Sequence, residues 1–345
     1  MSNIPGEIIL TPPRWSVIGF TFSKTHLSAE FVVMSNRLRY VIHATDDSLT
    51  KHQELRERFR FFLDVAENIE VDGHTVDDLY EWALEPLIPL LCQDARLPVE
   101  PRRRAPNLHD FLYAPVLEYT LGGESGELVL VPKMESSETR FMFGAFLPES
   151  CNAWPCYLPF DIRLERGTGE SAVPRKVILP DGTPAFFKLM RRGDETMLER
   201  ELASHDRLRA SQLPSSVRVA RLLGLVCNGN NLRSVFGLLL TYIDFQTTSL
   251  TRAVESGAQG RLRRRWTEQV MRIVHSLHQS RLVWDGASPN NVIIDANNNA
   301  WLVGLGGGAS GDWVPQELVG TIDGDLVALK KIVDFTEGGL SISYT

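Results

Sequence analysis

The sequence predicts an α+β fold, because both strand-like and helix-like stretches occur along the chain. Short apolar, β-branched runs fill residues 15–45, and helical periodicity follows from residue 49 to residue 91. Further apolar runs follow at residues 116–133, strand-like runs flank one helical stretch between residues 160 and 243, and a long helical pattern follows at 261–279. With 345 residues, of which 43% are hydrophobic, the chain can form one large or two ordinary domains with a buried core.

The composition argues against a nucleic-acid or membrane partner. The formal net charge of −7 provides no general phosphate-binding surface, and we interpret two arginine clusters, at 101–105 and 261–266, as solvated faces. The longest apolar run, VFGLLLTYI at 235–243, is shorter than the roughly 18 residues that a membrane span needs.

The cysteines and the first residues indicate an intracellular protein. The cysteines are too few and too scattered for a disulfide framework, and they suggest a reducing compartment: Cys92, Cys151, Cys156 and Cys227. No histidine or further cysteine lies near the pair in CNAWPC, so we predict no zinc site there. Because the start lacks the basic flank and apolar stretch of a signal peptide, we expect a soluble protein of the cytoplasm or nucleus.

The first part of the chain predicts a small sheet followed by helices and a hairpin. The runs WSVIGFTF, AEFVVM and LRYVIHA are strand-like, and ELRERFRFFLDVAENI is helical. Thr75 can cap a second helix, which Pro86 and Pro89 end or kink. The proline- and arginine-rich residues 93–107 form a loop or linker, and GGESGE then joins two alternating strands.

The second part predicts a mixed order of strands and helices after a linker at 147–160. Two strands, DIRLERGTGES and RKVILPDGTPAFFKLM, contain glycine turns and end near Lys188, and DETMLERELASHDRLRA is an amphipathic helix. Two apolar strands follow, and then a helix at 261–279 that buries Trp266, Val270, Ile273 and Leu277. The stretches RLVWDGASPNNVIID and AWLVGLGGG predict a strand-loop-strand alternation, and a last helix contains Asp325.

This order of parts, together with several local motifs, resembles the fungal-type protein-kinase-like domain family. The motifs are FFK, ERELASHDRL, GLLLTYI, HSLHQSRLVW, ASPNNVIID, AWLVGLGGG and GTIDGDL, and they lie within residues 160–336. The resemblance implies a bilobal kinase-like fold with an N-lobe at about 160–243 and a truncated C-lobe at about 244–336. LYEWALEPLIPLL and LHDFLYAPVLEYTL resemble the α/β accessory region of such proteins, here residues 1–150.

The resemblance implies a nucleotide site around Lys188. Lys188 would contact the α- and β-phosphates and pair with a helix glutamate, which is Glu201, with Glu199 as a nearby alternative. A surface lysine and ordinary helix carboxylates are the plainer interpretation.

Two further segments complete the implied site. Gly167 and Gly169 in RGTGES would form the glycine-rich loop, although a plain hairpin turn explains them equally well. The hinge would lie between Leu240 and Ile243, including Tyr242, and its backbone groups would meet an adenine.

The catalytic loop departs from the family pattern. Aligned with the family motif, Gly286 occupies the position of the base aspartate and Ser288 that of the loop lysine. Asp285 lies one residue early, and a slipped loop could bring it into use, although a displacement of roughly 3.5 Å usually disrupts in-line geometry.

The metal-binding turn also departs from the pattern. Gly304 takes the place of the metal-binding aspartate and Leu305 that of the following phenylalanine, so Asn291 remains as a neutral candidate ligand. Without the carboxylate, Mg²⁺ binding is expected to be weak or absent. Asp325 resembles the aspartate that braces the catalytic-loop backbone, a structural role.

Four hypotheses follow. The first is a pseudokinase that acts by interaction with a protein partner, either with ATP bound or without any nucleotide. The second is an enzyme whose kinase-like cleft has been adapted to a small molecule, for example in secondary metabolism. The third is a weakly active atypical kinase that uses Asp285, with Asn291 as the other catalytic candidate. A diverged copy under little functional constraint is a blander alternative.

Overall fold

The chain folds into α-helices and several β-sheets, which confirms the predicted α+β class. The computed structural model describes residues 13–68, 70–94, 105–133, 143–147, 153–165, 168–169, 171–211, 213–229, 231–244, 248–308 and 313–338. Two compact units are present: the first comprises residues 1–140 and 163–174, and the second residues 141–162 and 175–344. Among the described residues, none of the helices is both long and apolar enough to cross a membrane.

The first unit is built on one five-stranded sheet, in the order β1-β2-β3-β6-β7. Its elements are β1 (Trp15–Ser23), β2 (Ser28–Ser35), β3 (Leu38–Thr45), η1 (Asp47–Leu49), α1 (Gln53–Asn68), β4 (Glu70–Val71), β5 (His74–Thr75), α2 (Val76–Leu84), α3 (Leu87–Asp94), α4 (Leu108–Leu112), β6 (Val116–Glu124), β7 (Glu127–Pro132) and β10 (Arg163–Leu164).

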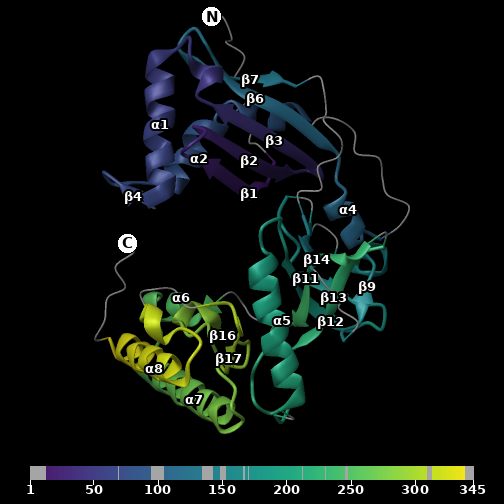
Figure 1. Cartoon of the computed structure of the whole chain (residues 1–345), viewed down its shortest axis with the longest axis vertical. Helices are drawn as coiled ribbons and strands as arrows, with labels where there is room; N and C mark the ends of the chain where they lie inside the picture. Colours follow the sequence, from purple (N-terminus) through teal and green to yellow (C-terminus); the bar gives the residue numbers. More distant parts are fainter. Residues whose placement is uncertain are drawn as a thin grey trace, which may run out of the picture. The chain divides into compact units, whose positions relative to one another are not determined.

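Alternating apolar side chains explain why this sheet buries one face under helices. The cross-strand pairs Phe31↔Ile42 and Val33↔Tyr40 point to the same face of β2 and β3, where α1 and α2 cover the sheet (Figure 1). The three strands predicted at 15–45 are thus confirmed. The predicted hairpin is also present, with Ser125 and Gly126 between β6 and β7 both at positive φ, as a two-residue primed turn requires.

The predicted start and end signals of the helices are confirmed as well. Thr75 caps α2 in a capping box, in which the Thr75 amide donates to the Asp78 carboxylate at 2.7 Å. This helix ends at Leu84 and α3 begins at Leu87, so the break falls around Pro86, whereas Pro89 ends no helix and lies in the first turn of α3.

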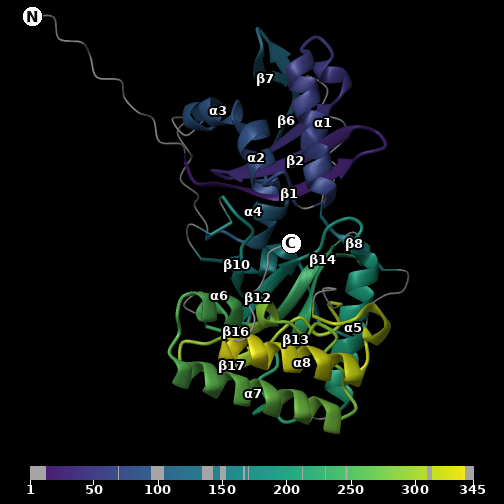
Figure 2. The same cartoon turned by 90° about the vertical axis from the view of Figure 1, so that its left-hand side faces the viewer.

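The second unit has a sheet part and a helical part (Figure 2). Its elements are β8 (Ala145–Phe146), β9 (Cys156–Tyr157), η2 (Pro159–Asp161), β11 (Lys176–Ile178), β12 (Pro184–Leu189), α5 (Glu195–Ala210), β13 (Leu222–Asn228), β14 (Asn231–Thr241), β15 (Thr248–Ser249), α6 (Leu250–Glu255), α7 (Gly260–Gln279), η3 (Pro289–Asn291), β16 (Val292–Ile294), β17 (Ala300–Leu302), η4 (Gln316–Leu318) and α8 (Ile322–Glu337).

In the sheet part the strands follow the order β11-β12-β14-β13-β9, and β8 pairs with β14. Helix α5 packs on the sheet through Leu198 and Leu202. The linker predicted at 147–160 was wrong in one respect, since it contains β9, a strand that runs parallel to β13. Such a short strand has too few residues to show a period, so only its long-range pairing defines it.

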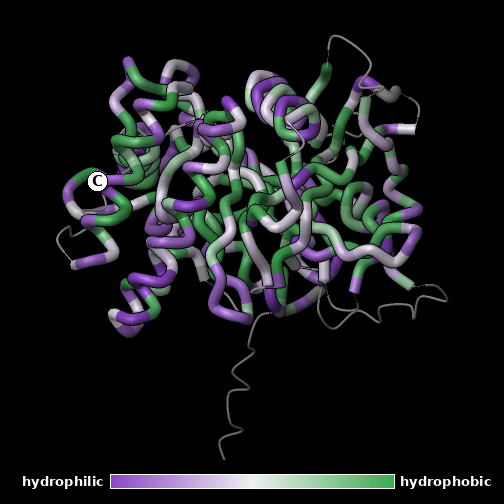
Figure 3. Tube along the Cα trace, turned by 90° about the horizontal axis from the view of Figure 1, so that it is seen from below, coloured by the Kyte–Doolittle hydropathy of each residue, from purple (hydrophilic) through white to green (hydrophobic). Residues whose placement is uncertain are grey.

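In the helical part α7 and α8 lie side by side, with the small sheet β15-β16-β17 next to them (Figures 1 and 2). The predicted inner face of α7 is confirmed, because Trp266, Val270, Ile273 and Leu277 are all buried. Figure 3 shows hydrophobic and hydrophilic residues interspersed along the Cα trace. Residues 281–284, predicted as part of a strand-loop-strand alternation, form no strand, because the amides of Arg281 and Leu282 donate to the carbonyls of His278 and Leu277 at the end of α7.

Candidate functional site

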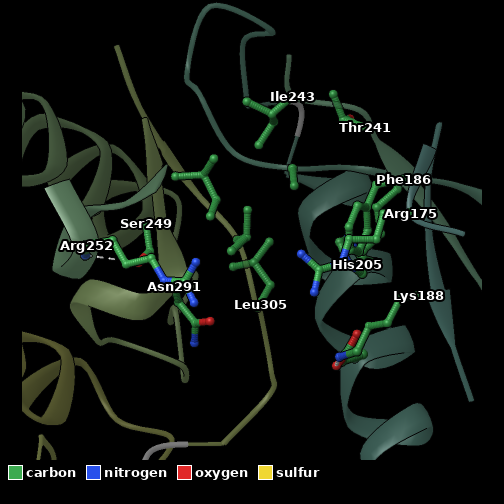
Figure 4. A pocket seen from close by; sticks show the side chains of 16 residues that line it. Arg175, Phe186, Lys188, His205, Thr241, Ile243, Ser249, Arg252, Asn291 and Leu305 are labelled. Atoms are coloured by element: carbon green, nitrogen blue, oxygen red, sulfur yellow. Dashed lines mark hydrogen bonds and ion pairs between the residues drawn. The ribbon is translucent and has the colours of Figure 1, made fainter. Parts of the chain in front are cut away.

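A cavity of about 480 Å³ lies within the second unit, between its sheet part and its helical part (Figure 4). Its size is within the range of small-molecule sites. The residues that line it are Arg175, Phe186, Lys188, Glu201, His205, Ala220, Leu240, Thr241, Ile243, Ser249, Arg252, Asn291, Ile293, Val303, Gly304 and Leu305.

Strand β12 directs Lys188 into this cavity. Side chains alternate along a strand, so Phe187 is buried in the core while Phe186 and Lys188 face the cavity. Gly237 on the neighbouring strand allows this close packing, because a Cβ there would lie 2.4 Å from the Phe187 ring.

The predicted pairing of Lys188 with Glu201 is present. The Lys188 ammonium donates to the Glu201 carboxylate, which is only 2% exposed, whereas Glu199 lies on the exposed side of α5. The carboxylate is thus neutralised where solvent cannot reach it. What the pair does toward a phosphate stays a prediction.

Only some of the other residues predicted for the nucleotide site line the cavity. Leu240 and Ile243 line the cavity, whereas Tyr242 does not, and its ring lies 5.1 Å from the Lys176 ammonium. Gly169 belongs to the first unit and has a φ of +72°, in keeping with a turn. Gly167 lies outside the described residues.

The two glycines that stand where aspartates were expected lie against each other. A Cβ on Gly286 would be 2.2 Å from the Gly304 carbonyl oxygen, and a Cβ on Gly304 would be 2.9 Å from Asn291 Nδ2. Asn291 Nδ2 in turn donates to the Gly286 carbonyl at 2.8 Å. Backbone and one amide side chain therefore fill the place where two carboxylates would have to fit.

Asp325 holds the backbone before Gly286 in place. Its buried carboxylate accepts hydrogen bonds from the amide of Trp284 at 2.7 Å and from the amide of Asp285 at 3.2 Å. His278 Nε2 lies 2.9 Å from the same carboxylate. The contact between Asp325 and this loop, expected from the resemblance, is present.

Asp285, the displaced candidate base, is not among the residues that line the cavity. Its backbone has a φ of +51°, an uncommon conformation for a residue with a side chain. The Oδ1 atom is buried and has no hydrogen-bond partner among the described residues. Burial raises the pKa of the Asp285 carboxyl, and Asp325 adds to the rise while Arg200 opposes it.

His205 is a cavity residue that the sequence analysis missed. It is 4% exposed, and its Nδ1 atom has no partner in the described part of the chain. Burial lowers the pKa of His205 to about 4, and the charges of Lys188 and Arg221 add to the effect. A neutral imidazole with one unused ring nitrogen therefore faces the cavity. Its position, one helical turn after Glu201, was the signal available in the sequence.

The charged groups around the cavity are mostly cationic. Arg175 and Arg252 line it from opposite sides (Figure 4), and neither guanidinium forms an ion pair with a described residue. Glu201 is the single carboxylate in the lining, and Lys188 already neutralises it. No group of three or more histidine, cysteine or acidic side chains able to hold a metal ion occurs in the described ranges. The positive charges of Arg175 and Arg252 favour an anionic ligand in this cavity.

Comparisons with known proteins find no matching family model and no matching curated protein. The resemblance to fungal-type kinase-like domains therefore stays a prediction that rests on the motifs.

Proposed function

We propose that this protein is a kinase-like protein that binds a nucleotide, or a related phosphorylated molecule, without transferring its phosphate. The observation that carries the proposal is the contrast inside one cavity: Lys188 and Glu201 are paired, while Gly286 and Gly304 leave no room for carboxylates. Phosphoryl transfer needs a metal clamp and a positioned base, each the kind of interaction that contributes several kcal/mol.

The arrangement of the second unit supports a bilobal interpretation. On this proposal its sheet part, with α5, would be the N-lobe predicted at about 160–243, apart from residues 163–174, which belong to the first unit, and its helical part would be the truncated C-lobe at about 244–336. Leu240 to Ile243 would then be the hinge that meets an adenine. The first unit, whose sheet and helices fold around a core of their own, corresponds to the accessory region.

The cationic lining supports binding without a divalent metal. In active kinases, metal ions neutralise the phosphates through carboxylate ligands. Here Arg175 and Arg252 offer guanidinium groups that bind phosphate oxygens directly. ATP is the first ligand to test. A protein or small-molecule partner would then recognise the ATP-bound form of the protein.

We expect ATP in the presence of EDTA to raise the melting temperature by about 5 °C at saturating ligand, because a ligand that binds the native state stabilises it by mass action. Added Mg²⁺ should give no further rise. The measurement is differential scanning fluorimetry. Arg252→Ala should reduce the shift, whereas Arg261→Ala, an exposed arginine away from the cavity, should leave it unchanged. A shift that appears only with Mg²⁺, or phosphate transfer abolished by Lys188→Ala, would contradict the proposal.

The second candidate function, a cleft adapted to a small molecule, is favoured by His205. A buried polar atom without a partner costs roughly 1–3 kcal/mol, so Nδ1 would be stabilised by a polar group on a ligand. A small molecule other than a nucleotide can supply this polar group. Native mass spectrometry of purified protein separates the two functions, because a retained metabolite that ATP does not displace favours the second.

The pKa of His205 predicts a pH dependence of stability. Its folded-state value of about 4 lies below the ordinary 6.5, so between these values the unfolded chain binds the proton and the folded chain does not. Stability contributed by this group therefore rises with pH across that window, by up to about 3 kcal/mol. His205→Gln should flatten the rise in urea titrations at pH 4.5 to 7, whereas the exposed control His26→Gln should not. Parallel curves for wild type and His205→Gln would contradict it.

A further inference from the structure

Two thiols from distant parts of the sequence lie side by side in the second unit. The Sγ atoms of Cys156 on β9 and Cys227 on β13 are 2.9 Å apart. Cys156 is exposed, whereas Cys227 is completely buried. We propose that they form a reversible redox site, in which a peroxide oxidises Cys156 and Cys227 resolves the product to an intramolecular disulfide.

The backbone holds the two thiols together. The register pairs Cys156 with Leu225 and Tyr157 with Val226, and the Leu225 amide donates to the Pro155 carbonyl at 2.8 Å. Gly224 allows this approach, because a Cβ there would lie 2.6 Å from the Tyr157 ring and 2.7 Å from the Pro155 oxygen. Strand β9 therefore cannot be moved away from β13 without losing this close packing.

Helix α5 holds the segment before β9 from a second direction. Arg209 donates to the Ala153 carbonyl at 2.6 Å, and its guanidinium carbon lies 4.2 Å from the centre of a Trp154 ring. The segment that ends in Cys156 is thus held by α5 as well as by β13. A second thiol fixed next to the first has a high effective concentration, which favours an intramolecular disulfide over other products.

The exposure of the two residues assigns their roles. The thiolate of Cys156, which solvent reaches, attacks one peroxide oxygen, so the O–O bond breaks and a sulfenic acid and one water form. Cys227 then attacks the sulfenic sulfur as a thiolate, and the S–O bond breaks to release the second water. In total two thiols lose two electrons and two protons, and one H₂O₂ becomes two H₂O. A thiol reductant then reduces the disulfide back to the two thiols and is itself oxidised to a disulfide.

The disulfide would act on the elements that build the cavity. Cys227 packs in the same core cluster as Leu198 and Leu202 of α5, the helix that carries Glu201. The bond would also close a chain segment, from 156 to 227, that contains Lys188. Because a cross-link of this kind restricts the unfolded chain, we expect oxidation to raise the melting temperature by about 5 °C or more.

The test is a peroxide titration of the purified full chain, followed by alkylation under denaturing conditions and peptide mass mapping. Equimolar H₂O₂ should yield a peptide that joins Cys156 to Cys227, while Cys92 and Cys151 remain alkylated. Dithiothreitol should restore both thiols. Oxidation of Cys156 to the sulfinic acid without the joined peptide would overturn the proposal, as would a bond from Cys156 to Cys151 or to a second chain.

Variants separate the two roles. Cys227→Ser should leave a sulfenic acid on Cys156 that dimedone traps, whereas Cys156→Ser should make Cys227 unreactive until the protein unfolds. Cys92→Ser is the matched control and should form the disulfide as the wild type does. If Cys227→Ser does not fold, the wild-type peptide map still decides the outcome. None of these results depends on nucleotide binding, so the redox site and the proposed function can fail separately.

Discussion

Gly286→Asp is expected to destabilise the protein by about 3 kcal/mol or more, or to prevent folding, rather than to restore a catalytic base. A Cβ at this position would lie 2.2 Å from the Gly304 carbonyl oxygen, a distance that no relaxation of a flexible side chain can relieve, because the neighbour is backbone. The loop cannot simply shift, since Asp325 binds the amides of Trp284 and Asp285. Urea unfolding of the variant measures the loss.

The matched control is Gly260→Asp, at the first position of α7. A Cβ there meets only the far end of the Arg263 side chain at 4.0 Å, and an aspartate at a helix N-terminus is favourable. We expect this variant to be as stable as the wild type. If Gly286→Asp were equally stable, or gained phosphotransfer activity, the tight contact between the two glycines would not exist in solution.

Gly304→Asp should be milder. Its φ of +71° is one that aspartate tolerates better than most residues, and the nearest atoms belong to the Asn291 side chain rather than to backbone. Displacing that side chain would still break its hydrogen bond to Gly286. The two positions are therefore coupled through Asn291, and restoring one carboxylate disturbs the site of the other.

This coupling separates two explanations of the glycines. If only the carboxylates had been removed, open space would remain where they stood, and aspartates could return. The close contact between Gly286 and Gly304 instead leaves no such space. If the cleft is kinase-like, as proposed, two features exclude the metal. The carboxylate ligands are absent, and the close packing of the two glycines leaves no room for them. The interpretation of Asp285 as a slipped base would require this packing to open.

Local patterns in the sequence were sufficient for most elements. The period of α7 identified its buried face, the Thr75 signal located the start of α2, and GGESGE located a hairpin. These features depend on residues within one turn or one strand of each other. The pairing of Lys188 with Glu201 was predicted from the family resemblance instead, because strand and helix meet only in three dimensions.

Features that depend on long-range contact were not predictable. Strand β9 exists because it pairs with β13, more than sixty residues away, and the proximity of Cys156 to Cys227 follows from that pairing. The neutral state of His205 depends on burial and on charges from other elements. The two glycines, Gly286 and Gly304, were identified in the sequence, but their contact could not be predicted because it joins two separate loops.

Breaking the buried ion pair is the second change with a large expected effect. Lys188→Met should lower the free energy of unfolding by about 3 kcal/mol, because it leaves Glu201, which is 2% exposed, as a buried carboxylate without a cation. Chemical denaturation at pH 7 measures this loss. Lys330→Met is the control, since Lys330 is exposed on α8 and has no ion pair with a described residue.

A second substitution distinguishes loss of the pair from loss of packing. Glu201→Leu in the Lys188→Met background removes the unpaired charge, so the double variant should recover most of the lost stability, and the cycle should give a coupling of roughly 2 kcal/mol or more. Neither variant should show the ATP-induced shift, because Lys188, which would contact the phosphates together with Arg175 and Arg252, is absent in both. If Lys188→Met were as stable as the control, the pair would be too hydrated to matter. Recovered stability with ATP binding still lost would show that Lys188 serves the ligand as well as the fold.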